Sequence, residues 1–207
     1  LHFDQIFGVL RAAKLEWEKT CELIPTGLYR FKDSKMSTRR GNFVTLLGVL
    51  EMAKEEVKKV IASRPQAQFS PEELEDVSQK VAIGALVFND LSVDPARDVE
   101  FDLARVLDFD GETGPYLQYA HTRCLSLLEK AKQEQSELFP LVWSEESAAP
   151  LSHEKEWALI RVIGKLPIVL DKTLQSRKAS VLTTYLIDLT KAFNQFYREC
   201  RVLGTDK

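Results

Sequence analysis

Residues 179–203 carry the strongest helical periodicity in the sequence. Apolar side chains recur there at three- and four-residue spacing, namely Leu182, Leu186, Leu189, Phe193, Phe196 and Cys200. This spacing places them on one wide stripe of a helix, and a stripe of that width has to pack against several other elements. The stretch therefore predicts a helical bundle. We interpret its aromatic residues as core rather than as a cofactor site.

Helical periodicity also covers most of the sequence between Thr45 and Pro167. Ser70, Pro71 and Glu73 predict a helix start, because serine can cap, proline suits the first helical position and glutamate completes a capping box. The other predicted boundaries are Thr45 as an N-cap, Arg64-Pro65 as an end, Pro115 as a start, Ser152 as a cap and Pro167 as a kink or division. The predicted buried stripes are Leu46, Leu50, Ala53, Val57, Val60 and Ile61, then Leu74, Val77, Val81, Ala85 and Phe88, then Leu117, Ala120, Cys124, Leu128 and Ala131.

The first 45 residues have a different pattern. Apolar residues at helical spacing predict a helix over residues 2–17. Pro25 and Gly27 follow, and residues 28–31 and 42–45 are predicted as short extended segments on either side of a basic loop. The expected fold is therefore mostly α-helical: a helical bundle over residues 46–207, preceded by the small edge of an α/β domain over residues 1–45.

The basic loop concentrates positive charge. Its cations are Arg30, Lys32, Lys35, Arg39 and Arg40, against the single anion Asp33. That much charge on a short loop repels itself unless an anion lies within it, and a phosphate chain suits lysine, arginine and the hydroxyls of Ser37 and Thr38. Gly41 lets the backbone approach a ligand closely. The alternative is a solvated basic surface loop.

A second candidate surface lies on the helix predicted over residues 115–133. Tyr116, Tyr119, Arg123 and Lys130 share one face, beside the glycine-containing loop of residues 109–114. Unpaired RNA bases stack on aromatic rings, and their phosphates need positive charge. The alternative is that the tyrosines are half-buried at the edge of the core and the cations are merely solvated. Tyr185 on the last helix could face either way.

Composition limits the class of protein. With 44% apolar and 29% charged residues, a chain of 207 residues is long enough for one large folded domain or two small ones, and no apolar run approaches a membrane span. Cys21, Cys124 and Cys200 are odd in number and far apart, which excludes a disulfide framework and favours a reducing compartment, so we expect a cytoplasmic protein. The three histidines have no ligand spacing with them, so no metal site is expected. The net charge of −3 argues only mildly against a nucleic-acid partner, because local patches decide such binding.

Two motifs carry a family resemblance. The segment KMSTRRG at residues 35–41 resembles the KMSKS-type signature of class I aminoacyl-tRNA synthetases, in the form seen in arginyl-tRNA synthetases. The segment FDGETGPYLQYAHTR at residues 109–123 is similar to the long signature of the same family, and residues 81–86 and 193–197 resemble its flanking elements. The resemblance covers nearly the whole chain, and the long signature is very specific.

The resemblance implies an organisation and a reaction. Residues 1–45 would be the end of a Rossmann-type catalytic domain, and residues 46–207 the helical anticodon-binding domain called DALR. Within that domain, residues 46–110 would form connecting, stem-contacting helices and residues 111–207 the anticodon-binding bundle. The parent enzyme, expected to be a monomer, would join L-arginine to ATP with Mg²⁺, release pyrophosphate and transfer arginine to its tRNA.

The resemblance also implies roles for residues. Lys35, Ser37 and Arg39 would embrace the ATP phosphates and balance the charge on the departing pyrophosphate, while Met36, Thr38 and Gly41 complete the ATP-binding loop. Thr38 stands where the family has its second lysine, so either Arg39 or Arg40 would take that role.

On the family pattern, Tyr116 and Tyr119 would stack on or pack beside anticodon bases, and Tyr185 is a weaker candidate. Arg123 and Lys130 are expected to contact RNA phosphates from the helical-face argument alone.

Parts of such an enzyme are absent from this sequence. The HIGH-type motif and the arginine pocket are not among these residues, and the chain begins at Leu1 rather than at a methionine, so we expect a piece of a longer protein that does not form adenylate alone. Two other classes stay open: a free-standing tRNA-binding module, and a helical protein-interaction domain whose basic loop is only surface.

Overall fold

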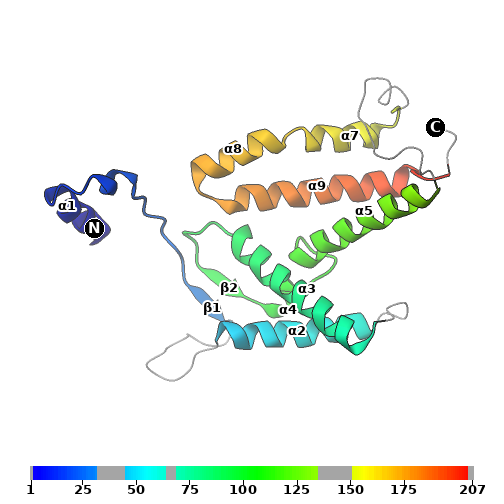
Figure 1. The fold of residues 1–207 in the computed structure, drawn as a ribbon, viewed down its shortest axis with the longest axis horizontal. Helices are drawn as coiled ribbons and strands as arrows, with labels where there is room; N and C mark the ends of the chain where they lie inside the picture. Colours follow the sequence, from blue (N-terminus) through cyan, green and yellow to red (C-terminus); the bar gives the residue numbers. More distant parts are fainter. Residues whose placement is uncertain (1, 32–44, 64–68, 135–150, 205–207) are drawn as a thin grey trace.

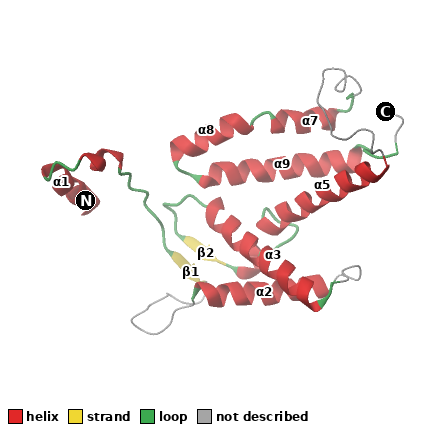
Figure 2. Ribbon diagram, in the orientation of Figure 1, coloured by secondary structure: helices red, strands yellow, loops and turns green. Residues whose placement is uncertain are grey.

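The computed structural model describes residues 2–31, 45–63, 69–134 and 151–204. The elements are α1 (His2–Ala12), the 3-10 helix η1 (Glu16–Thr20), β1 (Tyr29–Phe31), α2 (Leu46–Ala62), α3 (Pro71–Ser92), β2 (Val99–Phe101), α4 (Leu103–Val106), α5 (Gly114–Glu134), α7 (Glu154–Ile163), α8 (Leu166–Ser176) and α9 (Ala179–Glu199). Figures 1 and 2 show a mainly helical molecule with one small parallel sheet, β1 beside β2. The predicted fold class is confirmed.

Helix α9 has the several partners that its sequence requires. It packs against α3, α5, α7 and α8, and Figure 1 shows α7 and α8 following one another along its length. Its fully buried residues are Thr183, Tyr185, Ile187 and Thr190, whereas the predicted apolar stripe is half-buried. At about 100° per residue the buried positions lie on both sides of that stripe, because partners approach α9 from more than one direction.

Helices α2 and α3 form the main core together with β2 and α4. The buried residues of this core are Val49, Ala53, Val57, Ala82, Ala85, Phe101, Val106 and Leu107. Thr45 caps α2 by accepting the Gly48 amide at 3.0 Å, and Ser70 and Glu73 form the predicted capping box of α3. The prediction of burial is wrong for two residues: Leu46 is 77% exposed in the first turn of α2, and Leu128 is 47% exposed in the second half of α5.

Strand β1 is fixed to the helical part by polar contacts as well as by pairing. It runs parallel to β2, with Tyr29 opposite Val99 and Phe31 opposite Phe101. The Leu28 amide donates to Asp98 Oδ1 at 2.9 Å, and Arg30 pairs with Asp98 Oδ2 at 2.6 Å. These contacts hold the pKa of the Asp98 carboxyl below its ordinary value, the Leu28 amide being the largest cause.

Helix α3 also contacts this strand. The Tyr29 hydroxyl donates to Asp90, and burial, followed by this hydrogen bond, raises the pKa of Tyr29. Gly27 lies so close to the Arg97 carbonyl that a Cβ there would be 2.0 Å from its oxygen, so glycine is required. The strand that precedes residues 32–44 is therefore anchored to α3 and β2.

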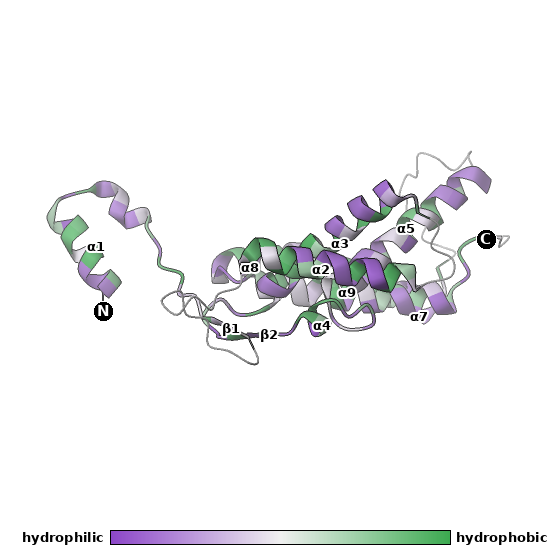
Figure 3. Ribbon diagram, turned by 90° about the horizontal axis from the view of Figure 1, so that it is seen from below, coloured by the Kyte–Doolittle hydropathy of each residue, from purple (hydrophilic) through white to green (hydrophobic). Residues whose placement is uncertain are grey.

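The N-terminal helices α1 and η1 lie away from the bundle (Figures 1 and 3). α1 has no buried residue, and the extended segment of residues 21–28 joins it to β1. The helix predicted over residues 2–17 therefore ends earlier, at Ala12, and η1 follows. None of the described helices is long and apolar enough to cross a membrane.

The helix pair that follows residue 150 begins one residue later than predicted. His153, rather than Ser152, is the N-cap of α7, because its Nδ1 accepts the Lys155 amide and Glu156 completes a capping box. Pro167 lies in the first turn of α8, and α7 and α8 are separate helices. The predicted division at Pro167 is confirmed.

Candidate nucleic-acid interface

The basic loop falls on residues whose structure is not described. Lys35, Met36, Ser37, Thr38, Arg39 and Gly41 all lie outside the described residues, as does Arg40. The described chain on either side consists of β1 and of Thr45, the N-cap of α2. The predicted ATP-phosphate site therefore stays a prediction.

Helix α5 begins where two backbones meet. A Cβ on Gly114 would lie 2.8 Å from the Gly84 carbonyl oxygen and 2.9 Å from the Ala85 Cα, so α5 starts directly against α3. Pro115 is buried at this contact, and the Gln118 amide donates to the Lys80 carbonyl of α3 at 3.3 Å. Part of the GPYLQYAH segment is thus a helix-packing motif, and the contact with α3 fixes which face of α5 is turned toward α9.

The face of α5 beside α9 carries Tyr116, Tyr119 and Arg123 in one hydrogen-bonded group with Asn194 of α9. Asn194 Nδ2 donates to the Tyr116 hydroxyl at 2.9 Å, and Arg123 Nη1 donates to Asn194 Oδ1 at 3.4 Å. Arg123 Nη2 donates to the Tyr119 hydroxyl at 3.0 Å. The structure therefore brings three of the predicted residues together.

The Arg123 guanidinium also contacts two aromatic rings. Its central carbon lies 4.4 Å from the Tyr119 ring centroid and 5.4 Å from that of Tyr197. A cation within about 6 Å of a ring face is attracted by the ring quadrupole. Tyr119 remains 43% exposed, so its ring is still accessible from solvent.

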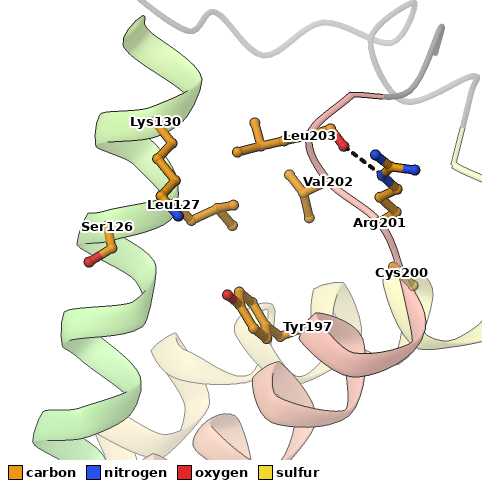
Figure 4. A pocket seen from close by; sticks show the side chains of 8 residues that line it. All are labelled: Ser126, Leu127, Lys130, Tyr197, Cys200, Arg201, Val202 and Leu203. Carbon is orange, nitrogen blue, oxygen red and sulfur yellow. Dashed lines mark hydrogen bonds between the residues drawn. The ribbon is translucent and has the colours of Figure 1, made fainter. Parts of the chain in front are cut away.

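Lys130 lies farther along α5, at a different recess. A hollow of about 280 Å³ is lined by Ser126, Leu127, Lys130, Tyr197, Cys200, Arg201, Val202 and Leu203. Figure 4 shows Lys130 and Leu127 on the α5 side, and Tyr197 and the chain beyond Cys200 on the other. The Arg201 Nε donates to the Leu203 carbonyl at 3.0 Å, which holds this short segment. Lys130 is thus on the same helix as Arg123 but does not belong to its hydrogen-bonded group.

Tyr185 does not join this surface. Its side chain is only 6% exposed, and its hydroxyl donates to the Ile163 carbonyl at 3.4 Å, at the end of α7. Burial raises the pKa of this hydroxyl. The structure argues against Tyr185 as an RNA contact, because a ring enclosed between α7 and α9 cannot meet a base.

Sequence reasoning missed Asn194 and Tyr197. Both lie in residues 193–197, which the sequence identifies only as a segment that resembles the family, and Tyr197 is exposed. Asparagine in the middle of a helix competes for backbone hydrogen bonds and is unfavourable unless its side chain has another partner. The position of Asn194 inside a predicted helix was the available signal, and Tyr116 and Arg123 are its partners.

Two family models match this chain. The model for "tRNA synthetases class I (R), catalytic domain" matches residues 1–103, and the model for the "DALR anticodon binding domain" matches residues 117–207. Together they leave only residues 104–116 unmatched. The chain belongs to the arginyl-tRNA synthetase family. It comprises the end of the class I catalytic domain and the DALR domain, as the motifs predicted.

Individual relatives agree with this assignment. Arginine–tRNA ligases from Clostridium perfringens and Clostridium beijerinckii are 37% and 36% identical over 207 residues, which is 100% of this chain and 35% of each relative. The chain thus spans about a third of the length of these relatives.

Two solved structures share the fold. Thermus thermophilus arginyl-tRNA synthetase matches with a TM-score of 0.67 and 27% identity, over 87% of this chain and 28% of that one. The synthetase from Plasmodium falciparum matches with a TM-score of 0.72 at 22% identity, over 98% of this chain and 33% of that one, and it supports the fold alone.

Proposed function

We propose that this chain is part of an arginine–tRNA ligase and that the α5–α9 surface binds the anticodon loop of arginine tRNA. The observation that carries the proposal is the Arg123 guanidinium held between the Tyr119 and Tyr197 rings and fixed by Asn194. Single-stranded RNA needs aromatic faces for its bases and cations for its phosphates, and this surface offers both.

The proposed roles follow from the chemistry of each side chain. Tyr119 stacks on an unpaired base. The Tyr116 hydroxyl accepts a hydrogen bond from Asn194, and the Tyr116 ring packs beside a base. Arg123 and Lys130 contact phosphates. The hollow in Figure 4 combines the Tyr197 ring with Leu127 and Val202, which suits a base turned out of its stack.

We also propose that the basic loop serves the reaction of the whole enzyme. Lys35, Ser37 and Arg39 would hold the phosphates of ATP, with Mg²⁺, while arginine is activated, and they would stabilise the charge that grows on pyrophosphate. The catalytic-domain match over residues 1–103 includes this loop and supports the assignment. We expect the chain alone to give no arginine-dependent pyrophosphate exchange, and turnover by the 207-residue chain would contradict this.

The proposed enzyme works as a cytoplasmic monomer. Cys21, Cys124 and Cys200 form no disulfide bond, which suits a reducing compartment. Sedimentation of the chain with and without tRNA measures the oligomeric state, and a stable dimer would contradict the proposal.

Filter binding tests the RNA-binding role. We expect the chain to bind arginine tRNA more tightly than the same tRNA with an exchanged anticodon, with an affinity that falls steeply as salt rises. Tyr119→Ala should weaken binding by roughly 1–3 kcal/mol if the ring stacks on a base. Trp157→Ala, which removes another exposed ring, on α7, is the matched control and should leave binding unchanged.

Two results would overturn the role. No binding of tRNA even at low salt would leave a helical protein-interaction domain. Unchanged binding by Tyr119→Ala together with a lower melting temperature would return Tyr119 to a purely structural role.

A further inference from the structure

Beside the Arg123 group, polar and charged residues of α5 and α9 line an open recess. It measures about 300 Å³ and is lined by Tyr116, Arg123, Lys191, Asn194, Gln195 and Arg198. Four of these residues come from α9, at positions i, i+3, i+4 and i+7, so they share one face of that helix. The recess is separate from the hollow in Figure 4, which is lined by other residues of α5 and α9 and by the chain after α9.

The recess gathers cations around a fixed amide. Arg123 lies on one side, from α5, and Lys191 and Arg198 lie one turn before and one turn after Asn194 on α9. Asn194 is itself oriented, because it donates to the Tyr116 hydroxyl and accepts from Arg123. The oriented Asn194 amide with three cations around it is complementary to an anion that also accepts hydrogen bonds.

Two acidic residues lie near these cations. Glu112, in the loop before α5, forms an ion pair with Lys191, and this hydrogen bond raises the pKa of Lys191. The carboxylate of Asp188, one turn before Lys191 on α9, adds negative charge near Lys191 and also raises its pKa. Since Glu112 and Lys191 are both well exposed, the pair is weak and an incoming anion can replace Glu112.

We propose that this recess is a phosphodiester subsite, in which Lys191 and Arg198 of α9 bind a backbone phosphate of the tRNA and Asn194 positions Arg123 for the same strand. The inference rests on the proposed RNA-binding function, which assigned no residue of α9 to phosphate. It gives the RNA strand a path along the α5–α9 seam, with cations on both helices.

The salt dependence of tRNA binding tests the subsite. For single-stranded RNA, the logarithm of the binding constant falls with the logarithm of salt by about 0.7 per neutralised phosphate. Lys191→Gln and Arg198→Gln should each reduce that slope, and the double variant, which removes both cations from the phosphate, should reduce it by about 0.7. The matched control is Lys172→Gln on α8, an exposed lysine outside the recess, which should leave the slope unchanged.

A second variant gives an effect of opposite sign. Glu112→Gln removes the competitor of Lys191, so it should tighten tRNA binding, whereas a purely structural ion pair would leave binding unchanged and lower the melting temperature. For the positioning role, Asn194→Leu should weaken tRNA binding and lower the salt slope because Arg123 loses its acceptor.

The outcomes separate the two proposals. If the chain binds tRNA and Tyr119→Ala weakens it, but Lys191→Gln and Arg198→Gln keep the parent slope, the subsite is wrong and the proposed function stands. An equal loss of slope in Lys172→Gln also overturns the subsite, since the effect would then be one of total charge. Absence of any tRNA binding overturns both.

Discussion

Arg123 shows why an arginine rather than a lysine suits this surface. Its planar guanidinium lies over the Tyr119 ring, reaches the Tyr197 ring and donates to Asn194 and the Tyr119 hydroxyl. A lysine ammonium is a point charge that cannot stack as a plane or donate in a fork. The side chain is therefore oriented before any RNA arrives, which lowers the cost of ordering it on binding.

At the residue scale we predict that Arg123→Lys weakens tRNA binding although the charge is kept. The loss should be roughly 1–2 kcal/mol, the size of a cation–π contact, or about 5- to 30-fold in affinity. Filter binding at constant salt measures it, with Arg161→Lys on α7 as the control. Parent affinity in Arg123→Lys would mean that only the charge of this residue matters.

The tyrosines show what a sequence can predict about single residues. The sequence predicts Tyr116 and Tyr119 on a face beside the apolar stripe of their helix. That stripe packs against α3, and the neighbouring face with the tyrosines lies outside this contact. Tyr185 lies close to its own stripe too, but α9 is covered on several sides, and this residue is buried. Helical spacing predicts the direction in which each side chain leaves the helix, whereas the number of helices packed around it decides which of these side chains are buried.

At the element scale, the crossing of α3 and α5 depends on Gly114. A Cβ there would come within 3 Å of both Gly84 and Ala85, and these are backbone atoms that cannot turn aside. Gly114→Ala should therefore push the helices apart and lower the free energy of unfolding by roughly 1–3 kcal/mol, the usual cost of overpacking. Thermal or urea unfolding followed by circular dichroism measures this change.

Gly164→Ala is the matched control for that prediction. Gly164 ends α7 with φ −62°, and a Cβ there would meet nothing closer than 3.5 Å. Alanine is the better helix former, so this variant should be neutral or more stable by up to about 1 kcal/mol. Equal destabilisation of both variants would show that the α3–α5 contact is looser than described.

A helix start could be predicted and the strand pair could not, for a physical reason. The capping box of α3 is local, because the Ser70 hydroxyl accepts the Glu73 amide and the Glu73 carboxylate accepts the Ser70 amide. The pairing of β1 with β2 joins two three-residue strands some 70 residues apart, and it depends on long-range contacts such as Leu28 with Asp98. Three residues are too few to show an alternating pattern.

At the scale of the whole molecule, the turn between α8 and α9 forms ion pairs with the N-terminal segment and with the loop after α3. Arg177 pairs with Glu22 at 2.8 Å, and Lys178 pairs with Asp94 at 2.6 Å, both at the turn between α8 and α9. The Lys178 hydrogen bond is the largest cause that lowers the pKa of Asp94. Through the Glu22 pair and the Asp98 contacts, the chain before the basic loop is connected to the part that carries the proposed RNA surface.

This arrangement predicts how acid weakens the molecule. The ordinary pKa of an aspartate is 3.8, and folding lowers the pKa of Asp98 below this value. The ionised carboxylate therefore stabilises the fold fully above pH 3.8, and this stabilisation is lost as the pH falls through the lower pKa of the folded chain. Asp94 shifts in the same direction. Below pH 3.8 we expect the protection of the Val99 amide, which donates to Leu28, to decrease in hydrogen exchange. Asp98→Asn should flatten this pH dependence because amides do not titrate, whereas a variant that loses protection as steeply as the parent chain would mean that β1 is held by other groups.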